Sequence, residues 1–327
     1  MPAKERFGVA AILSKNNSIN LSGLDYKKIN FSWYFDYCYE NSPVGTKKYF
    51  PLIGAYSKSG SRKIPDIDVL NNLIKKNRSK YPDNTIWFIG NEVGFDDGLS
   101  PAEYAKHYNY YYKCLKKINP TYKIAFGAVP AQYSYVWDFI TGSKKPLWQG
   151  YPTDYIIDCH KAYSEIFNKK MPVDFYRLNP LAPSIHYDID NMPHNISFFK
   201  NRIIKFRRMM KSIGEQNKPL IIAEFGVLKD SSHKEVIEYM YKALDFLTSK
   251  KDKKLGCPND GYRLVQMWSW YSLIGGGEWN KNGALFDSNL KITPLGMAYA
   301  KYIDNLNDDC SKKEKLSYLD IIKRYFK

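Results

Sequence analysis

Short apolar runs alternate with amphipathic stretches along the chain, and this alternation constrains the fold more than any other feature. Eight runs have the length and composition of buried strands; they lie near residues 6–13, 28–37, 48–57, 85–91, 122–129, 173–187, 219–225 and 263–272. Strands separated by helices form parallel sheets, because each crossover returns the chain to the same edge. Eight such strands close a barrel. The sequence therefore predicts an α/β protein, a (β/α)8 TIM barrel.

Local signals mark where two of the helices begin. Ile64-Pro65-Asp66 is expected to open a helix that runs to Lys76, with the proline in its first turn. Ser100-Pro-Ala-Glu103 has the spacing of a capping box, which predicts a second helix. Tyrosines at spacings of three and four follow, a stripe typical of a core face, and His107 on this stripe is expected to be structural.

The remaining organisation fits one domain. Residues 193–215 combine a basic and an apolar face, which fits an outer barrel helix and, as an alternative, a helix that binds phosphates or a membrane surface. Residues 131–172 are expected to hold the fifth helix and an enlarged loop. From about residue 308 a Lys-rich helical tail is expected to pack on the barrel. Because no repeat or linker interrupts the chain, residues 1–327 are predicted to form a single catalytic domain.

Two of the predicted strands end in a glutamate. Residues 85–92 form an apolar run that stops at Asn91 and Glu92, and residues 218–226 form one that stops at Glu224 before a glycine. Loops at the C-terminal ends of barrel strands build active sites, so both carboxylates are expected at the barrel mouth. Burying a carboxylate is costly unless it is paired or faces a cleft, which favours a functional role over a structural ion pair.

Side-chain alternation along the second of these strands predicts which way Glu224 points. Residues two apart in a strand share a face. Leu220 and Ile222 are therefore expected to point into the barrel with Glu224, whereas Ile221 and Ala223 are expected to face the helices.

The two glutamates end the fourth and the seventh of the eight predicted strands, and this placement bears on their function. Glu92 ends the fourth predicted strand and Glu224 the seventh. Two carboxylates across a barrel mouth can flank one glycosidic bond; a separation of ~5–5.5 Å fits retention of configuration and ~6.5–9.5 Å fits inversion. Asn91-Glu92 and Ala223-Glu224-Phe225-Gly226, in this order, resemble the signature of clan A, the retaining (β/α)8 glycoside hydrolases. Further segments resemble family 128 and family 39 type catalytic cores: residues 31–34, 50–54, 265–273, 283–287 and 293–296.

This resemblance implies roles for four residues. Glu92 would protonate the departing glycosidic oxygen and then deprotonate water, and Glu224 would attack the anomeric carbon. Asn91 would hydrogen-bond the sugar 2-hydroxyl. Trp268 would carry the sugar ring where the bond breaks, although a tryptophan at this position also fits the core.

Other residues are expected to bind substrate around this centre. His186 and Tyr187 resemble the region near strand six that in many clan members contacts substrate and nucleophile, and Tyr176 is an alternative for the tyrosine. The remaining predicted subsite residues, each with packing or a surface loop as the alternative, are Trp33, Asp36, Trp270 and Trp279.

Other chemistries lack their motifs. No H-E-x-x-H and no histidine and carboxylate cluster predicts a metal, so no cofactor and no metal are expected. Residues 275–280 lack the Lys-Ser/Thr of a P-loop, and no G-x-S-x-G elbow is present. Cys159 and His160 are adjacent on a predicted helix and would point about 100° apart, a poor dyad. Five scattered cysteines predict no disulfide framework.

The net charge of +16 suits an anionic partner, but the lysines are scattered, which is typical of a solvated surface. An acidic glycan such as a capsule or exopolysaccharide is one hypothesis for the substrate; nucleic acid is not expected. No apolar run of about 18 residues predicts a membrane span. Without an evident signal peptide, a cytoplasmic location is expected, or a secreted or surface location if an export signal was trimmed.

Together these features predict a monomeric, retaining glycoside hydrolase that acts within an oligo- or polysaccharide by double displacement at Glu92 and Glu224. The alternative is a non-catalytic protein that binds glycans or nucleic acid on the same scaffold, since fold alone does not fix function.

Overall fold

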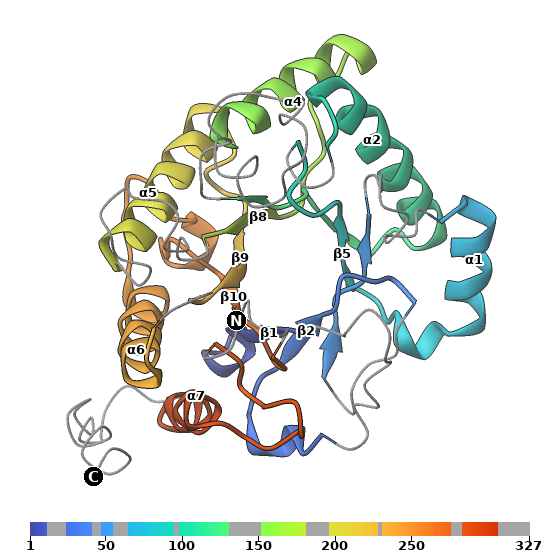
Figure 1. Ribbon diagram of the computed structural model, residues 1–327. Coiled ribbons are helices and arrows are strands. Elements are labelled where there is room, and N and C mark those ends of the chain that lie inside the picture. Colours follow the sequence, from blue (N-terminus) through green and yellow to red (C-terminus); the bar gives the residue numbers. More distant parts are fainter. Residues whose placement is uncertain are drawn as a thin grey trace.

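A computed structural model describes residues 1–11, 24–40, 47–54, 65–94, 98–130, 152–180, 196–227, 231–275 and 283–306. Within them, strands form a central ring and helices surround it (Figure 1). The strands are β1 (Phe7–Ala10), β2 (Trp33–Phe35), β3 (Lys48–Tyr49), β4 (Leu52–Ile53), β5 (Ile86–Ile89), β6 (Lys123–Ala125), β7 (Val129–Pro130), β8 (Tyr176–Asn179), β9 (Leu220–Phe225) and β10 (Met267–Tyr271). The helices are α1 (Ile67–Lys76), α2 (Pro101–Ile118), α4 (Pro152–Phe167), α5 (Ile196–Ser212), α6 (His233–Ser249) and α7 (Pro294–Asp304).

All strand pairings are parallel, and the first strand pairs with the last. The strands run in the order β3-β2-β1-β10-β9-β8-β7 in one sheet and β4-β5-β6 in the other. Backbone hydrogen bonds bridge the two sheets: the Leu52 amide of β4 donates to the Cys38 carbonyl, just after β2 (2.8 Å), and the Phe126 amide, just after β6, donates to the Phe175 carbonyl, just before β8 (2.8 Å). The predicted third and fifth strands are each split into two short pieces, so ten strands occupy eight positions. The predicted (β/α)8 fold is confirmed, with strands shorter than expected.

Two apolar clusters form the core, one inside the ring of strands and one between the strands and the helices. The smaller one fills the barrel, because it joins side chains from strands that are not neighbours: Phe35 of β2 lies 5.4 Å from Phe88 of β5, measured between ring centroids. It also contains Trp33, stacked on Phe50 at 4.7 Å. The larger cluster packs the outer face of the strands against the helices. Both faces of the sheet are thus buried from solvent, as is usual for parallel sheets.

A β-bulge in β9 corrects the predicted faces of this strand. Ile221 and Ala223 belong to the inner cluster and Leu220 and Ile222 to the outer one, so the predicted assignment is wrong. The register against β10 passes from Ile222 opposite Trp268 to Phe225 opposite Trp270, which leaves an extra residue in β9. A bulge of this kind re-aims side chains at a sheet end. It lets Glu224 point into the barrel although its alternation partners Leu220 and Ile222 point outward.

The predicted helix starts are found with one shift. Asp66 is the N-cap of α1 and accepts a hydrogen bond from the Asp68 amide (2.8 Å), so Pro65 precedes the cap instead of lying in the first turn. Ser100 and Glu103 form the predicted capping box of α2. His107 is half-buried on α2, and the burial of its ring lowers its pKa to about 4. Among the described residues, no helix is both long and apolar enough to cross a membrane.

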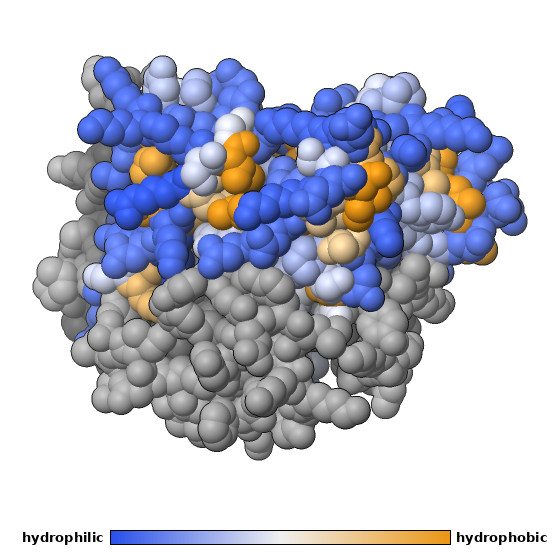
Figure 2. Space-filling model, turned by 90° about the horizontal axis from the view of Figure 1, so that it is seen from above, coloured by the Kyte–Doolittle hydropathy of each residue, from blue (hydrophilic) through white to orange (hydrophobic). Residues whose placement is uncertain are grey.

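Helix α5 is an outer barrel helix, but one of its arginines is internal. Arg207 is wholly buried and donates to the carbonyl oxygens of Leu264 (2.5 Å) and Lys218 (2.9 Å) and to Gln266 Oε1 (2.5 Å). It joins α5 to the N-terminal ends of the strands and is not part of a basic face. The outer surface is mainly hydrophilic with small separate apolar areas, as Figure 2 shows for one side. This agrees with the predicted solvated surface.

Candidate active site

Polar side chains gather where β2, β5, β8, β9 and β10 end. These strands are parallel, so their C-terminal ends lie at one end of the ring. At these ends the described residues include both predicted catalytic glutamates and four polar or aromatic residues that the sequence did not single out as site residues: Tyr37, Arg177, Asn179 and Tyr271.

A tight turn after β5 carries Glu92. Gly90 has φ +82° and Glu92 has φ +44°, a left-handed conformation that is uncommon for a residue with a side chain. The Tyr104 hydroxyl donates to the Ile89 carbonyl (2.8 Å) and accepts from the Gly127 amide (2.7 Å), which fixes the end of the strand from the helix side. The position of Glu92 is therefore set by backbone geometry.

Strand β8 supports the same turn from inside the barrel. The Arg177 guanidinium donates to the Gly90 carbonyl (2.9 Å) and lies 3.8 Å from the centroid of the Phe88 ring. Asn179, two residues further on and therefore on the same face of the strand, donates to Glu92 Oε1 (3.2 Å). One strand thus holds both the backbone and the carboxylate of the Glu92 turn.

Glu224 shares its surroundings with Glu92 through two tyrosines. Burial, followed by the charge of Glu224 and, with the smallest effect, the charge of Glu92, raises the pKa of Tyr37 well above its usual value. Burial followed by the charges of Glu224 and Glu92 raises the pKa of Tyr271. Because both carboxylates act on the same two hydroxyls, Glu92 and Glu224 lie at one site. Glu224 is only 5% exposed, whereas Glu92 is more open to solvent.

Asn91 and Asp36 are also at this end of the barrel. Asn91 is buried beside Glu92 in the turn after β5. Asp36 directly follows β2 and is buried; its Oδ1 accepts from the Tyr49 hydroxyl (2.9 Å) and from the Cys38 amide (3.3 Å). Their proposed contacts with sugar remain predictions.

The three described tryptophans among the predicted subsite residues are packed inside the protein. Trp33, Trp268 and Trp270 are each 0% exposed. Trp268 packs edge-on against Phe7 in the outer cluster (4.9 Å between centroids), and the Trp270 indole donates to the Gly283 carbonyl (2.7 Å). These positions match the packing alternative, and the structure does not bring the three rings to the carboxylates.

The aromatic side chain that β10 does bring to the site is Tyr271, the residue after Trp270. Tyr176 does not take the role suggested for it: its hydroxyl lies 2.7 Å from His160 Nε2 in the outer layer, between β8 and α4. The predicted residues His186, Tyr187 and Trp279 lie outside the described residues.

The residues missed from the sequence carry a positional signal. Asn179 and Tyr271 end their strands, and Tyr37 stands two residues after β2. Applying the strand-end rule to amides and phenols as well as to carboxylates would have found them. Arg177 had no such signal, because a basic residue in a short apolar strand also fits an ion pair.

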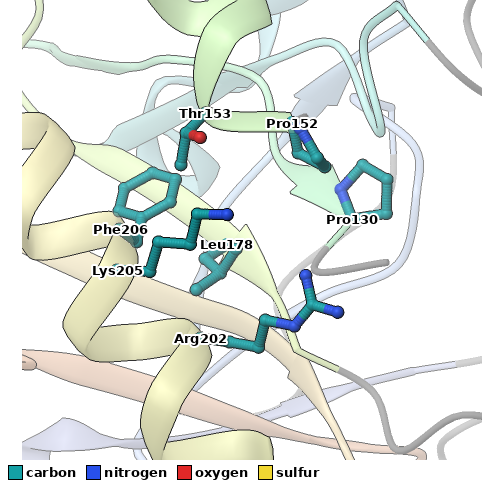
Figure 3. Close-up of a pocket in the computed structure, with 7 residues that line it drawn as sticks. All are labelled: Pro130, Pro152, Thr153, Leu178, Arg202, Lys205 and Phe206. Atoms are coloured by element: carbon teal, nitrogen blue, oxygen red, sulfur yellow. The ribbon is translucent and has the colours of Figure 1, made fainter. Parts of the chain in front are cut away.

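Two further observations concern other places in the described residues that could bind a ligand. In the part of the chain that the structure describes, no group of three histidine, cysteine or acidic side chains could hold a metal ion. A pocket lies between the start of α4 and α5 (Figure 3), and neither Glu92 nor Glu224 lines it. It is lined by Pro130, Pro152, Thr153, Leu178, Arg202, Lys205 and Phe206.

Comparisons with known proteins support the fold. No family model and no curated protein matches the sequence. Among solved structures, a GH128 (subgroup II) endo-beta-1,3-glucanase from Sorangium cellulosum is similar, with 17% identity, a TM-score of 0.58, and coverage of 90% of this chain and 97% of that one. A monomeric beta-xylosidase from Caulobacter crescentus is also similar, with 13% identity, a TM-score of 0.59, and coverage of 93% of this chain and 69% of that one. A GH128 (subgroup VII) oligosaccharide-binding protein from Trichoderma gamsii is similar as well, with 11% identity, a TM-score of 0.52, and coverage of 93% of this chain and 96% of that one.

These likenesses establish that the chain has the (β/α)8 fold found in clan A glycoside hydrolases, as the sequence motifs indicated. Because this fold serves both enzymes and an oligosaccharide-binding protein, function has to be argued from the site.

Proposed function

We propose that this protein is a retaining glycoside hydrolase with Glu92 as general acid/base and Glu224 as nucleophile. The observation that carries the proposal is that two strand-end glutamates act on the same two tyrosine hydroxyls at the barrel mouth. Their environments differ in the way that the two roles require. Glu224 is nearly enclosed, which keeps a nucleophile dry and oriented, whereas Glu92 is open enough to exchange protons with water.

The reaction would take two steps. In the first, the Glu224 carboxylate attacks the anomeric carbon while the Glu92 carboxyl gives its proton to the departing oxygen; the glycosidic bond breaks and a glycosyl ester forms. In the second, the Glu92 carboxylate takes a proton from water, the water oxygen attacks the anomeric carbon, and the ester bond to Glu224 breaks. Asn179, which donates to Glu92 Oε1, would orient the acid in both steps.

The substrate proposed first is a β-1,3-glucan cleaved within the chain, because the similar Sorangium enzyme is an endo-beta-1,3-glucanase. The net charge of +16 favours an acidic glycan as the second choice. A panel of laminarin, curdlan, xylan and anionic exopolysaccharides separates these choices. Raising the ionic strength should weaken binding of an acidic glycan, and a flat response would count against it.

Substitution of each glutamate tests the roles separately. Glu224→Gln should abolish turnover on every substrate. Glu92→Gln should lose about 10²–10⁴-fold on a glycan but much less on an aryl glycoside with an acidic leaving group, which departs without a proton. Glu165→Gln, on the exposed side of α4, is the matched control and should behave as wild type. Proton NMR of the first product would show whether the anomeric configuration is retained.

A non-catalytic glycan-binding protein is the second candidate, because the similar Trichoderma protein is described as oligosaccharide-binding. This function predicts saturable binding of laminaripentaose by the wild type, no product after long incubation, and equal affinity in Glu92→Gln. Turnover that depends on both glutamates would exclude it.

A further inference from the structure

We propose that a basic surface at the N-terminal end of the barrel binds an acidic polysaccharide. This basic patch consists of the C-terminal end of α5 and the loop from α6 to β10. Its exposed cations are Arg208, Lys211, Lys250, Lys251, Lys253 and Lys254. The inference goes beyond the proposed function, because the patch is separate from the two glutamates and its role needs no turnover.

The patch lies at the end of the barrel opposite the catalytic mouth. A loop that leads from a helix into the next strand lies at the N-terminal end of that strand, whereas Glu92 and Glu224 lie at C-terminal strand ends. Residues 250–266 lead from α6 into β10, and α5 ends shortly before β9 begins. Figure 1 shows α5 and α6 as neighbours on the outside of the ring. A polymer on the patch therefore leaves the mouth free.

Contacts between segments far apart in the sequence bring the cations together. The Lys211 ammonium of α5 donates to the Lys254 carbonyl (3.0 Å), which joins the helix to the loop. Within the loop, Lys251 forms an antiparallel bridge with Arg263. Lysines that are scattered along the chain thus form one continuous surface in the fold.

The acidic residues of the loop do not neutralise these cations. Asp252 Oδ1 accepts from the amides of Lys254 (2.7 Å) and Leu255 (3.1 Å) and so stabilises its own turn. Asp260 forms a bidentate pair with Arg6, with both N–O distances 2.7 Å. Among the described residues, none of the six cations of the patch forms an ion pair. Because like charges repel one another, the patch brings no gain in stability, which favours a role in binding an anion.

An exposed tyrosine lies within the patch. Tyr262 is 38% exposed and has φ +61°, directly after Gly261 at φ +60°. The amide of Asp252, between Lys251 and Lys253, donates to the Tyr262 carbonyl (2.9 Å), so Tyr262 lies beside these lysines. A left-handed backbone is rare for a bulky aromatic residue, and residues held in such conformations cluster at functional sites.

Lysines around a single ring fit an acidic polysaccharide better than other polyanions. An exposed aromatic ring offers an apolar face to a sugar ring, and flexible ammonium groups attract carboxylates at variable spacing. Sites for single-stranded nucleic acid stack successive bases on aromatic rings, and membrane-binding faces carry several apolar side chains. Of the exposed large hydrophobic side chains in the described residues, only Tyr262 belongs to the patch. The ligand class is therefore a polymer of sugars that carry carboxylates.

Binding of polygalacturonate tests the patch. The patch variant replaces the four loop lysines by glutamine: Lys250→Gln, Lys251→Gln, Lys253→Gln and Lys254→Gln. The matched control has the same net charge and changes exposed lysines of α1 and α2, on the other side of the ring (Figure 1): Lys75→Gln, Lys76→Gln, Lys113→Gln and Lys117→Gln.

We expect the affinity of the patch variant to fall at least about 10-fold at low ionic strength, with a difference that shrinks as salt is added. The control should bind like wild type, and urea unfolding should show both variants folded. Absence of binding in wild type, unchanged affinity in the patch variant, or equal losses in both variants would overturn the proposal.

A separate substitution tests the sugar platform. Tyr262→Asn removes the ring, and asparagine tolerates a left-handed backbone. It should weaken binding of polygalacturonate about 2–10-fold and leave the salt dependence unchanged. Wild-type affinity in Tyr262→Asn would overturn the choice of a glycan, as would tighter binding of an oligo-dT strand or of phosphatidylserine vesicles.

The role of the patch is separable from catalysis. Glu224→Gln should bind polygalacturonate as tightly as wild type, and the patch variant should cleave a neutral glucan at the wild-type rate. If the wild type cleaves no glycan, the proposed function fails while the binding measurements still decide the role of the patch. Loss of binding in Glu224→Gln would place the acidic glycan at the mouth and refute the proposal.

Discussion

Replacing Arg177 by methionine should leave the fold intact and remove most of the activity. Arg177 is wholly buried inside the barrel, where it donates to the Gly90 carbonyl (2.9 Å) and lies over the Phe88 ring (3.8 Å). Methionine has a similar length and no charge. The substitution therefore removes the guanidinium under the Glu92 turn and leaves the space nearly filled.

The expected change in the free energy of unfolding is a small difference between opposing contributions. Leaving the buried Gly90 carbonyl without its donor costs about 1–3 kcal/mol, and losing the cation–π contact costs about 2 kcal/mol. Against this, an apolar side chain avoids the desolvation of a buried guanidinium, and such replacements are often neutral or stabilising by about 1–4 kcal/mol. Arg177→Met should thus unfold within about 2 kcal/mol of wild type.

Activity should respond far more strongly. The Gly90 carbonyl is two residues before Glu92, so losing its donor loosens the turn that aims the acid. A displacement that misplaces a reacting group can cost about 10²-fold in rate. We therefore expect kcat/KM of Arg177→Met to fall by at least this factor, measured as initial rates on the best glycan, while urea unfolding reports stability.

Arg207→Met provides the contrasting control. Arg207 is equally buried but donates to three oxygen acceptors, on Leu264, Lys218 and Gln266, far from the mouth. Its loss removes the donor from three acceptors, at about 1–3 kcal/mol each, and relief of guanidinium desolvation offsets only about 1–4 kcal/mol of this cost. Arg207→Met should therefore destabilise the protein by about 3 kcal/mol or more, without lowering the rate of the folded fraction. The reasoning about Arg177 would be refuted if Arg177→Met were as unstable as Arg207→Met, or if it kept wild-type turnover.

Three further predictions concern stability. Ser232→Ala removes the N-cap hydrogen bond of the α6 capping box and should cost about 1 kcal/mol in urea unfolding, with kcat unchanged. Gly94→Ala places a methyl group 2.3 Å from the Tyr155 ring at φ +80°, so it should cost about 1–3 kcal/mol and also slow turnover, because the same turn holds the acid. Burial lowers the pKa of His107 and of His160 to about 4, below the unfolded value of about 6.5. Stability should therefore be complete above pH 6.5 and be lost progressively as pH falls towards 4, and His160→Asn should flatten this dependence in urea unfolding at pH 7 and 4.5.

Much of the fold follows from local patterns in the sequence. Apolar runs and helix caps depend on residues only a few positions apart, so the eight strand positions and the capping box at Ser100 could be located without a structure. The strand ends also marked Glu92 and Glu224, because in a parallel barrel the C-terminal ends of all strands meet at one end.

What the sequence could not decide depends on residues far apart in the chain. The bulge in β9 depends on the register of this strand with β10. Before the bulge, the side chains face opposite to the predicted directions, and the extra residue then lets Glu224 point into the barrel. Likewise, whether Trp268 lines a cleft or fills the core depends on Phe7, its partner on the neighbouring strand β1, which is 261 residues away in the chain.

The sequence by itself thus determined the barrel and the two carboxylates, because periodicity and strand ends are local properties. Only the tertiary structure decided which neighbours these carboxylates have: Tyr37 beside Glu224, and Arg177 and Asn179 beneath and beside Glu92. The physical reason is that each of these contacts joins residues more than eighty positions apart, and no local pattern encodes such a distance.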